Sequence, residues 1–479
     1  MPRRLLALTA ILAAFSDIAR SESPQRLVRL TVTATDSKGN AVTDLQRDEI
    51  AVHEDGKSYP LVFFRFSGLT RDLAPAGAEN SEIANHSEPA PTFVLLDRWN
   101  DRLTSAATAW SDVTNALRHL ESVERVYVYF LTNHGELVPV HPLPATDADL
   151  RRAPQPSPAE LAAKLDDAFR AATGFRDTAA QDPLARVNTT IQTLTALGEQ
   201  MASVAGRKNL LWITHGIPLR ARLLNGDWAD FAPRLQLLCE AAARSQIAIY
   251  TVDQSAAGVG ANPIAFARQT LEMLTSLTGG RWYDSGNSTR AFSGVMTDSR
   301  GSYRLAYYAP IRERPGERKI HVTSTRKGIH LLTRDAYLNE TADPPADLVA
   351  EAALGAQGRS PFDAAEIALR VSLTRNPAAK TIHLAIRINP SDLVFEHTAE
   401  KYQASLSVMT ASYADGFLKQ TTAPVPVHVS LTQDQLDLAT KNGLSTSQDF
   451  PIPQAIQKIR VIVFDRALYA LGSVTIPIN

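Results

Sequence analysis

The chain has 479 residues, of which 44% are apolar and 21% charged, and its 49 Lys and Arg against 50 Asp and Glu leave a net charge of −1. This length predicts several folding units, and the composition is that of an ordinary globular protein. The absence of a basic surplus argues against nucleic acid as a partner. A single cysteine, Cys239, excludes both a disulfide framework and a cysteine-based zinc site.

The N-terminus has the layout of a secretory signal peptide. Arg3 and Arg4 precede an apolar stretch over residues 5–15, and polar residues follow it. This pattern predicts a signal peptide at 1–21 and export to the periplasm, the envelope or the outside of the cell. A short buried helix is the alternative. Beyond residue 16 no run approaches the ~20 apolar residues of a membrane-spanning helix, so we expect none in the mature chain.

The segment 22–68 is predicted to be a small N-terminal β module. Residues 27–35 alternate between apolar and polar side chains, which is typical of a half-buried strand. Asp55 and Gly56 form a strong hairpin signal between two further strands. Residues 69–90 show little periodicity and are predicted to be a linker.

From residue 91 the sequence alternates between short apolar runs and amphipathic stretches. The apolar runs suit strands buried on both faces of a parallel sheet, and they lie at 93–96, 126–131, 210–213 and 247–252. Residues 136–141 are expected to add one antiparallel strand. Ser157 with Pro158 and Glu160 predicts a capped helix start, and helices are also expected to begin at Pro183 and Pro263.

This order of elements predicts a doubly wound, Rossmann-like α/β domain over 91–340. A further β pair at 302–308 and 318–325 is expected to close it. Residues 341–363 read as a second linker, with room for a short helix. Closely spaced alternating runs from 364 to 479 then predict a C-terminal antiparallel β-sandwich.

Several motifs, taken in order, resemble the von Willebrand factor A (VWA)-related proteins of the acidobacterial type. The motifs are residues 36–40, 54–56 and 63–64, the strand and helix ends at 93–97, 208–213, 249–253 and 277–280, and the tail at 301–308, 318–322 and 334–337. The resemblance covers roughly residues 27–340. It implies an exported binding or adhesion-type domain, with no established enzymatic activity.

The resemblance also implies a place for a metal-dependent adhesion site, in which a strand ends in Asp-x-Ser-x-Ser. Asp97 matches the first aspartate, but Trp99 and Asp101 occupy the hydroxyl positions, and His215 stands where a second aspartate is expected. The site would therefore be degenerate. Asp97, Asn100 and Asp101 could still offer oxygens to Mg²⁺ or Mn²⁺, although no cofactor is expected. In the alternative, Asp97 caps or tethers the segment that follows it.

Ligands of parallel sheets bind at the carboxyl ends of the strands. The candidates for a binding face at this edge are Asp97, Trp99, Asn100, Asp101, His215 and Asp253. A structural role is the alternative for each of them. The sequence contains no nucleophile elbow, phosphate-binding loop or zinc-protease motif.

These observations predict an exported VWA-like protein that mediates protein–protein recognition or adhesion at the cell envelope, without evident catalysis and with an unknown protein partner. Two alternatives remain open. One is a structural scaffold of an envelope assembly, and the other is a hydrolase whose site is not recognisable from sequence.

Overall fold

The computed structural model describes residues 25–68, 82–100, 106–152, 155–171, 183–223, 225–254, 261–284, 287–312, 316–339, 344–376, 378, 381–398, 400–451 and 456–478. The predicted signal peptide, most of the predicted linker at 69–90, and Asp101 lie outside these residues. Within the described ranges, no helix is both long enough and apolar enough to cross a membrane.

The predicted fold class, a doubly wound Rossmann-like α/β domain with appended β modules, is wrong. Strands account for 42% of the structure and helices for 30%, and most sheets are antiparallel. Among the described sheets, parallel pairing is confined to one six-stranded sheet. Strands that precede this sheet in the sequence pair with strands that follow it, in separate antiparallel sheets. The error has a physical cause, because periodicity shows that a strand is half-buried but does not show which distant strand it pairs with.

The N-terminal strands form as predicted, but they do not form a separate unit. They are β1 (Gln25–Thr35), β2 (Ile50–Glu54), β3 (Lys57–Tyr59) and β4 (Leu61–Gly68). The predicted hairpin between β2 and β3 is confirmed, with Asp55 and Gly56 at φ of 49° and 79°. Positive φ at both turn residues matches the right-handed twist of the flanking strands.

Four strands from residues 301–339 complete the two sheets that contain β1 to β4. They are β14 (Gly301–Pro310), β15 (Gly316–Ser324), β16 (His330–Leu332) and β17 (Ala336–Asn339). The sheet orders are β16-β1-β14-β4 and β17-β15-β2-β3. The predicted β pair at 302–308 and 318–325 is therefore wrong, because β14 and β15 each pair with N-terminal strands in different sheets.

The parallel sheet has the order β13-β12-β9-β6-β7-β8, with β8 antiparallel to β7 as predicted. Its strands are β6 (Thr92–Asp97), β7 (Val126–Leu131), β8 (Leu137–His141), β9 (Lys208–Thr214), β12 (Ile247–Asp253) and β13 (Trp282–Tyr283). The four predicted apolar runs all lie in these strands and are buried. Two further strands, β10 (Arg220–Arg222) and β11 (Trp228–Asp230), form a separate hairpin.

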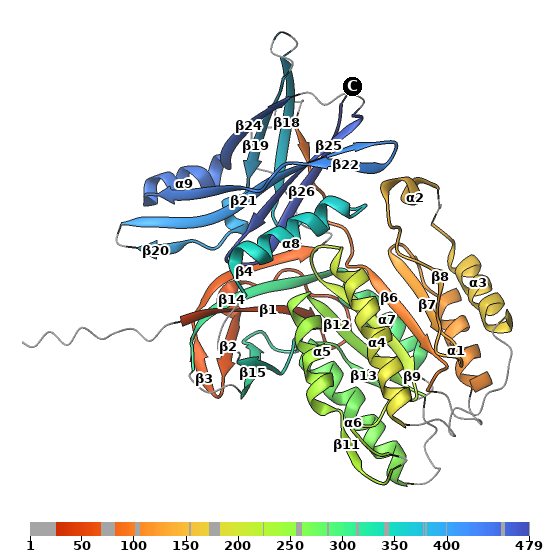
Figure 1. Ribbon diagram of the computed structural model, residues 1–479. Coiled ribbons are helices and arrows are strands. Elements are labelled where there is room, and N and C mark those ends of the chain that lie inside the picture. Colours follow the sequence, from red (N-terminus) through yellow and green to blue (C-terminus); the bar gives the residue numbers. More distant parts are fainter. Residues whose placement is uncertain are drawn as a thin grey trace, which may run out of the picture.

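Helices cover both faces of the parallel sheet (Figure 1). On one face lie α4 (Pro183–Ala202), α5 (Ala232–Arg244) and α6 (Ala261–Thr278), and on the other α1 (Ala106–Arg118), α3 (Pro158–Ala171) and α7 (Ser288–Ser299). The predicted start of α3 is confirmed, because the backbone N–H of Ser157 donates to the Glu160 carboxylate at 2.7 Å. Cys239 on α5 is buried, which raises the pKa of its thiol to about 12.

The C-terminal region contains two antiparallel sheets with a shared apolar core. One has the order β24-β19-β18-β5, and the other joins β20, β21, β25 and β26, with β22 and β23 on β21. The bounds are β5 (Ile83–Ala84), β18 (Leu369–Asn376), β19 (Thr381–Ile388), β20 (Glu396–Thr398), β21 (Lys401–Ala414), β22 (Phe417–Thr421), β23 (Val425–Leu431), β24 (Leu444–Pro451), β25 (Lys458–Asp465) and β26 (Ala470–Pro477). Short helices α2 (Asp147–Arg152) and α9 (Gln433–Asn442) flank these strands.

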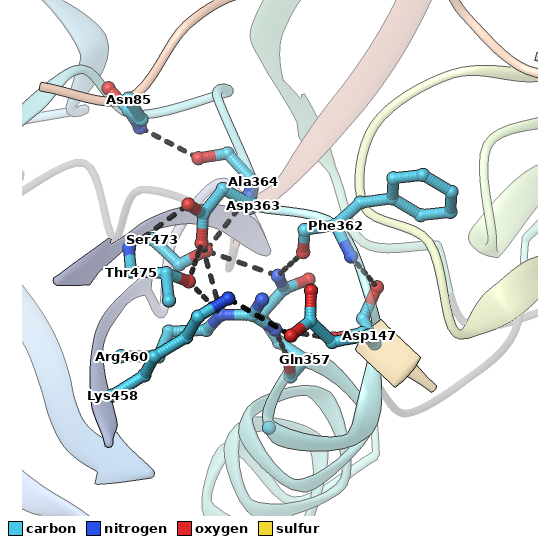
Figure 2. A network of polar contacts seen from close by, with 12 residues as sticks. Asn85, Asp147, Gln357, Phe362, Asp363, Ala364, Lys458, Arg460, Ser473 and Thr475 are labelled. Atoms are coloured by element: carbon cyan, nitrogen blue, oxygen red, sulfur yellow. Dashed lines mark hydrogen bonds and ion pairs between the residues drawn. The ribbon is translucent and has the colours of Figure 1, made fainter. Parts of the chain in front are cut away.

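The segment predicted as a second linker contains α8 (Ala346–Arg359), which lies between the C-terminal strands and β14 (Figure 1). Its last turn is held by a buried polar network around Arg460 (Figure 2). The Arg460 guanidinium donates to the carbonyls of Gln357 and Ser360 and forms an ion pair with Asp363. This network fixes α8 against β25 and β26.

Candidate functional site

Asp97 ends β6 at the carboxyl edge of the parallel sheet and is 4% exposed. Its Oδ2 accepts hydrogen bonds from the Asn100 amide at 2.7 Å, the Thr214 hydroxyl at 2.7 Å and the Trp212 indole N–H at 3.1 Å. Its Oδ1 accepts from the backbone N–H of Asn100 at 3.1 Å. Four donors use the acceptor capacity of one carboxylate, so Asp97 tethers the turn at 97–100 to β9.

The first turns of α4 cover this edge. The Asn100 amide also donates to the Thr190 hydroxyl at 2.9 Å, and Arg186 donates to the side-chain oxygen of Asn100 at 3.3 Å. The Trp99 indole N–H donates to the carbonyl of Arg186 at 3.2 Å. The Trp99 ring lies against Gly135, where a Cβ would stand 3.3 Å from its nearest ring carbon. Gly135 has a φ of +82°, which favours glycine, and the close approach of the ring leaves little room for a side chain.

The structure brings five of the six predicted binding-face residues to this edge and describes nothing of Asp101. Asp97 and Asn100 bond to each other, and Trp99 and Asn100 bond to α4. His215 follows Thr214 in the chain, and Asp253 pairs with Thr214 in register. Both are buried, at 4% and 6% exposure.

No group of three or more His, Cys, Asp or Glu side chains in the described part of the chain could hold a metal ion. Of the proposed oxygen ligands, the carboxylate of Asp97 and the amide of Asn100 are both engaged in the bonds given above. A cation at this place would have to replace donors that already satisfy Asp97.

The β10–β11 hairpin follows β9 and presents an exposed tryptophan. Along each strand the side chains alternate. Ala221 and Ala229 are paired in register and pack on the core, whereas Arg222 and Trp228, also paired, face outward. Trp228 is 67% exposed, the largest value among the exposed large apolar side chains of the described residues.

Asp230 holds the base of this hairpin. Its Oδ1 accepts from the backbone N–H of Ala232 at 3.0 Å, and its Oδ2 accepts from Arg220 at 3.0 Å. These bonds hold the pKa of the Asp230 carboxyl below its usual range, the backbone bond having the larger effect. The backbone N–H of Phe231, which is itself buried, donates to the carbonyl of Leu219 at 2.8 Å. The outward face of the hairpin is therefore preorganised.

Sequence reasoning missed Arg186, Thr190, Thr214 and Trp228. For the hairpin a signal existed, because Asn225 and Gly226 form a turn pair typical of hairpins, and Gly226 adopts a φ of +91°. For Arg186 and Thr190 no local signal existed. Their role depends on which helix covers the edge, and this is decided by tertiary packing.

The sequence matches no protein-family model and no curated protein. The resemblance to VWA-related proteins therefore stays a prediction from the motifs alone.

Proposed function

We propose that the protein is an exported recognition protein that binds a protein partner through the outward face of the β10–β11 hairpin. The observation that carries the proposal is Trp228, which is 67% exposed on a hairpin whose base is fixed to the core and to α5. The N-terminal sequence favours export, and the resemblance to VWA-related proteins favours a role in recognition or adhesion at the cell envelope.

The energetics support Trp228 as the anchor of an interface. A tryptophan offers a large apolar surface with an N–H donor, and tryptophan is enriched among the residues that dominate binding energy. Its rigid ring loses little conformational entropy on binding. Because Asp230 already fixes the hairpin base, a partner would not have to order it, and this lowers the cost of association.

The surroundings of Trp228 have the composition of an interface rim. Arg222 lies opposite it on β10, and the ion pair of Arg220 with Asp230 lies two register positions further along, with side chains that are 66% and 43% exposed. An aromatic centre with a charged, solvent-exposed rim is the usual arrangement of a non-obligate protein interface.

The proposal is tested by partner capture from envelope extracts of the producing cells, with the captured protein then purified and titrated against Trp228→Ala. We expect this variant to lose about 2 kcal/mol of binding free energy, which corresponds to a roughly 30-fold higher dissociation constant. Its unfolding midpoint should change little, because the side chain is mostly exposed.

The matched control is Leu438→Ala, which shortens another exposed apolar side chain, 59% exposed on α9. It should leave capture unchanged. A partner held equally well by wild type and Trp228→Ala would refute the hairpin as the recognition surface and would favour the scaffold alternative. Saturable hydrolysis of an ester or peptide, abolished by a point change at the Asp97 edge, would favour the hydrolase alternative.

A further inference from the structure

A cavity of about 340 Å³ lies at the opposite end of the parallel sheet, where β9 and β12 begin. Its walls include β1, β14, α8, the start of β9 and the end of α5. The loop between β25 and β26 also contributes to them. In Figure 1, β1 and β14 lie directly beneath α8, between it and the parallel sheet. The volume is at the lower end of the range for small-molecule sites.

The cavity wall is strongly basic, although the chain as a whole has a net charge of only −1. Its described lining contains two acids, Glu240 and Glu366, and seven basic residues, Arg26, Arg29, Arg207, Lys208, Arg244, Arg304 and Arg334. Low-dielectric walls concentrate the field of charges that line a concave surface, so this wall attracts anions.

Two cations in this wall, which are consecutive in the sequence, are deeply buried. Arg207 is 8% exposed and Lys208 is 3% exposed. The Lys208 ammonium donates to the carbonyl of Val204 at 2.8 Å. One guanidinium nitrogen of Arg207 donates to the Tyr250 hydroxyl at 3.0 Å and the Gly279 carbonyl at 3.2 Å, and its Nε has no hydrogen-bond partner.

The partners of both cations are therefore neutral oxygens. Within the described residues, no carboxylate forms an ion pair with Arg207 or Lys208. Arg207 is linked to the Asp298 carboxylate on α7 only indirectly. The Tyr250 hydroxyl accepts from Arg207 and donates to Asp298.

The two acids of the wall are engaged elsewhere. Glu366 accepts from the Gln246 amide at 2.8 Å and the backbone N–H of Leu471 at 3.1 Å, and it lies 3.5 Å from the Arg304 guanidinium. Glu240 accepts from the backbone N–H of Leu338 at 2.7 Å. Glu366 therefore acts on the Lys208 charge without direct contact, and neither acid of the wall forms an ion pair with Arg207 or Lys208.

Burying a charge without a counter-charge is costly, and folded proteins rarely keep such groups without a function. Burial lowers the pKa of the Lys208 ammonium to about 8, and the negative charge of Glu366 partly opposes this shift. An anion in the cavity would supply a counter-charge in direct contact and would stabilise the charged form of Lys208.

We propose that this cavity is a binding site for a small organic or inorganic oxyanion, a carboxylate or a phosphate, whose oxygens accept hydrogen bonds from Arg207 and Lys208. The site is independent of the hairpin, which lies beyond the carboxyl end of β9. Recognition of a protein partner and binding of the oxyanion can therefore fail separately.

The test is calorimetric titration of the full chain with inorganic phosphate and, separately, with citrate. Wild type should bind at least one of the two with a stoichiometry near one. Lys208→Met should weaken that binding at least 10-fold, and Lys208→Gln, which keeps a donor but removes the charge, should weaken it too. Binding of phosphate alone assigns the cavity to phosphates, and binding of citrate alone assigns it to carboxylates.

The matched control is Lys419→Met, which makes the same change of charge at an exposed position on β22. It should leave binding unchanged. The proposal is overturned if wild type binds neither anion saturably, or if Lys208→Met and Lys419→Met reduce the affinity equally, because the attraction would then be that of net charge alone.

Discussion

The two ends of the parallel sheet differ in how completely their buried charges are hydrogen-bonded. At the carboxyl end, the Asp97 carboxylate accepts four hydrogen bonds from Asn100, Trp212 and Thr214. At the amino end, Arg207 and Lys208 have neutral partners only among the described residues. The fully hydrogen-bonded Asp97 has a structural role, whereas Arg207 and Lys208, which form no ion pair within the described part of the chain, indicate a place for a ligand.

Arg460 provides a third case, at the base of α8, and it resembles Asp97. This arginine is 4% exposed, yet it has an ion pair with Asp363 at 3.0 Å and donates to the Thr475 hydroxyl at 2.8 Å. Figure 2 shows how densely its surroundings are bonded. The chain is thus able to supply a carboxylate to a buried cation, and it does not do so for Arg207 and Lys208.

Asp97→Ala is expected to have the largest effect on stability. It leaves the buried donors of Trp212, Thr214 and Asn100 without their acceptor, which should cost about 3 to 5 kcal/mol in the free energy of unfolding, measured in urea. A loss below about 1 kcal/mol, together with saturable Mg²⁺ binding that the variant abolishes, would contradict the structural role. Asp97 would then serve a metal.

Asp363→Ala is expected to lower the free energy of unfolding by somewhat less than Asp97→Ala does. It leaves the Arg460 guanidinium buried without its counter-charge, at about 3 kcal/mol, whereas the carbonyls of Gln357 and Ser360 still accept from it. The control is Asp167→Ala, whose side chain is 74% exposed in a surface pair with Arg170. This control should change stability by less than about 0.5 kcal/mol. Equal effects of the two variants would contradict the account of the network.

Lys208→Met is expected to stabilise the protein by about 1 to 2 kcal/mol at pH 7 in the absence of an anion. The pKa of Lys208 is about 8 in the folded chain against 10.5 when unperturbed, which corresponds to about 3 kcal/mol against the charged form. Loss of the bond to the Val204 carbonyl offsets about 1 kcal/mol of this.

The stability difference between Lys208→Met and wild type should depend on pH in one direction only. Since the pKa of Lys208 is lowered on folding, the unfolded chain holds the extra proton on this residue between about pH 8 and 10.5, and the contribution of Lys208 to wild-type stability rises across this window. The advantage of Lys208→Met should therefore be full below pH 8 and shrink above it. The other charged groups that line the cavity, Arg26, Arg29, Arg207, Glu240, Arg244, Arg304, Arg334 and Glu366, are present in both proteins. Unfolding in urea from pH 6 to 10 checks this, and a variant that is less stable at every pH would contradict it.

Local structure could be predicted from the sequence, and long-range pairing could not. Alternation located β1, and the capping pattern at Ser157 located the start of α3. However, β1 pairs with β14, beginning with Gln25 opposite Pro310, and no periodicity connects segments so far apart. The predicted fold class failed for this reason.

In the candidate site, too, the local features were predictable and the long-range packing was not. A strand-end aspartate pointed to Asp97, and the turn after it to Asn100. Lys208 begins a strand that was recognised correctly, but its burial depends on α5, β14 and α8 closing around it. A charged residue at a strand start is ordinarily exposed, so nothing in the local sequence could indicate the cavity.

The most direct measurement is a crystal structure of the protein grown with selenate, a phosphate-like oxyanion whose selenium gives an anomalous signal. We expect an anomalous peak inside the cavity, within hydrogen-bonding distance of the Lys208 ammonium and the Arg207 guanidinium. No peak should appear beside Asp97. Peaks confined to surface arginines, with an empty cavity, would contradict the claim that the buried cations at the amino end of the sheet form an oxyanion site.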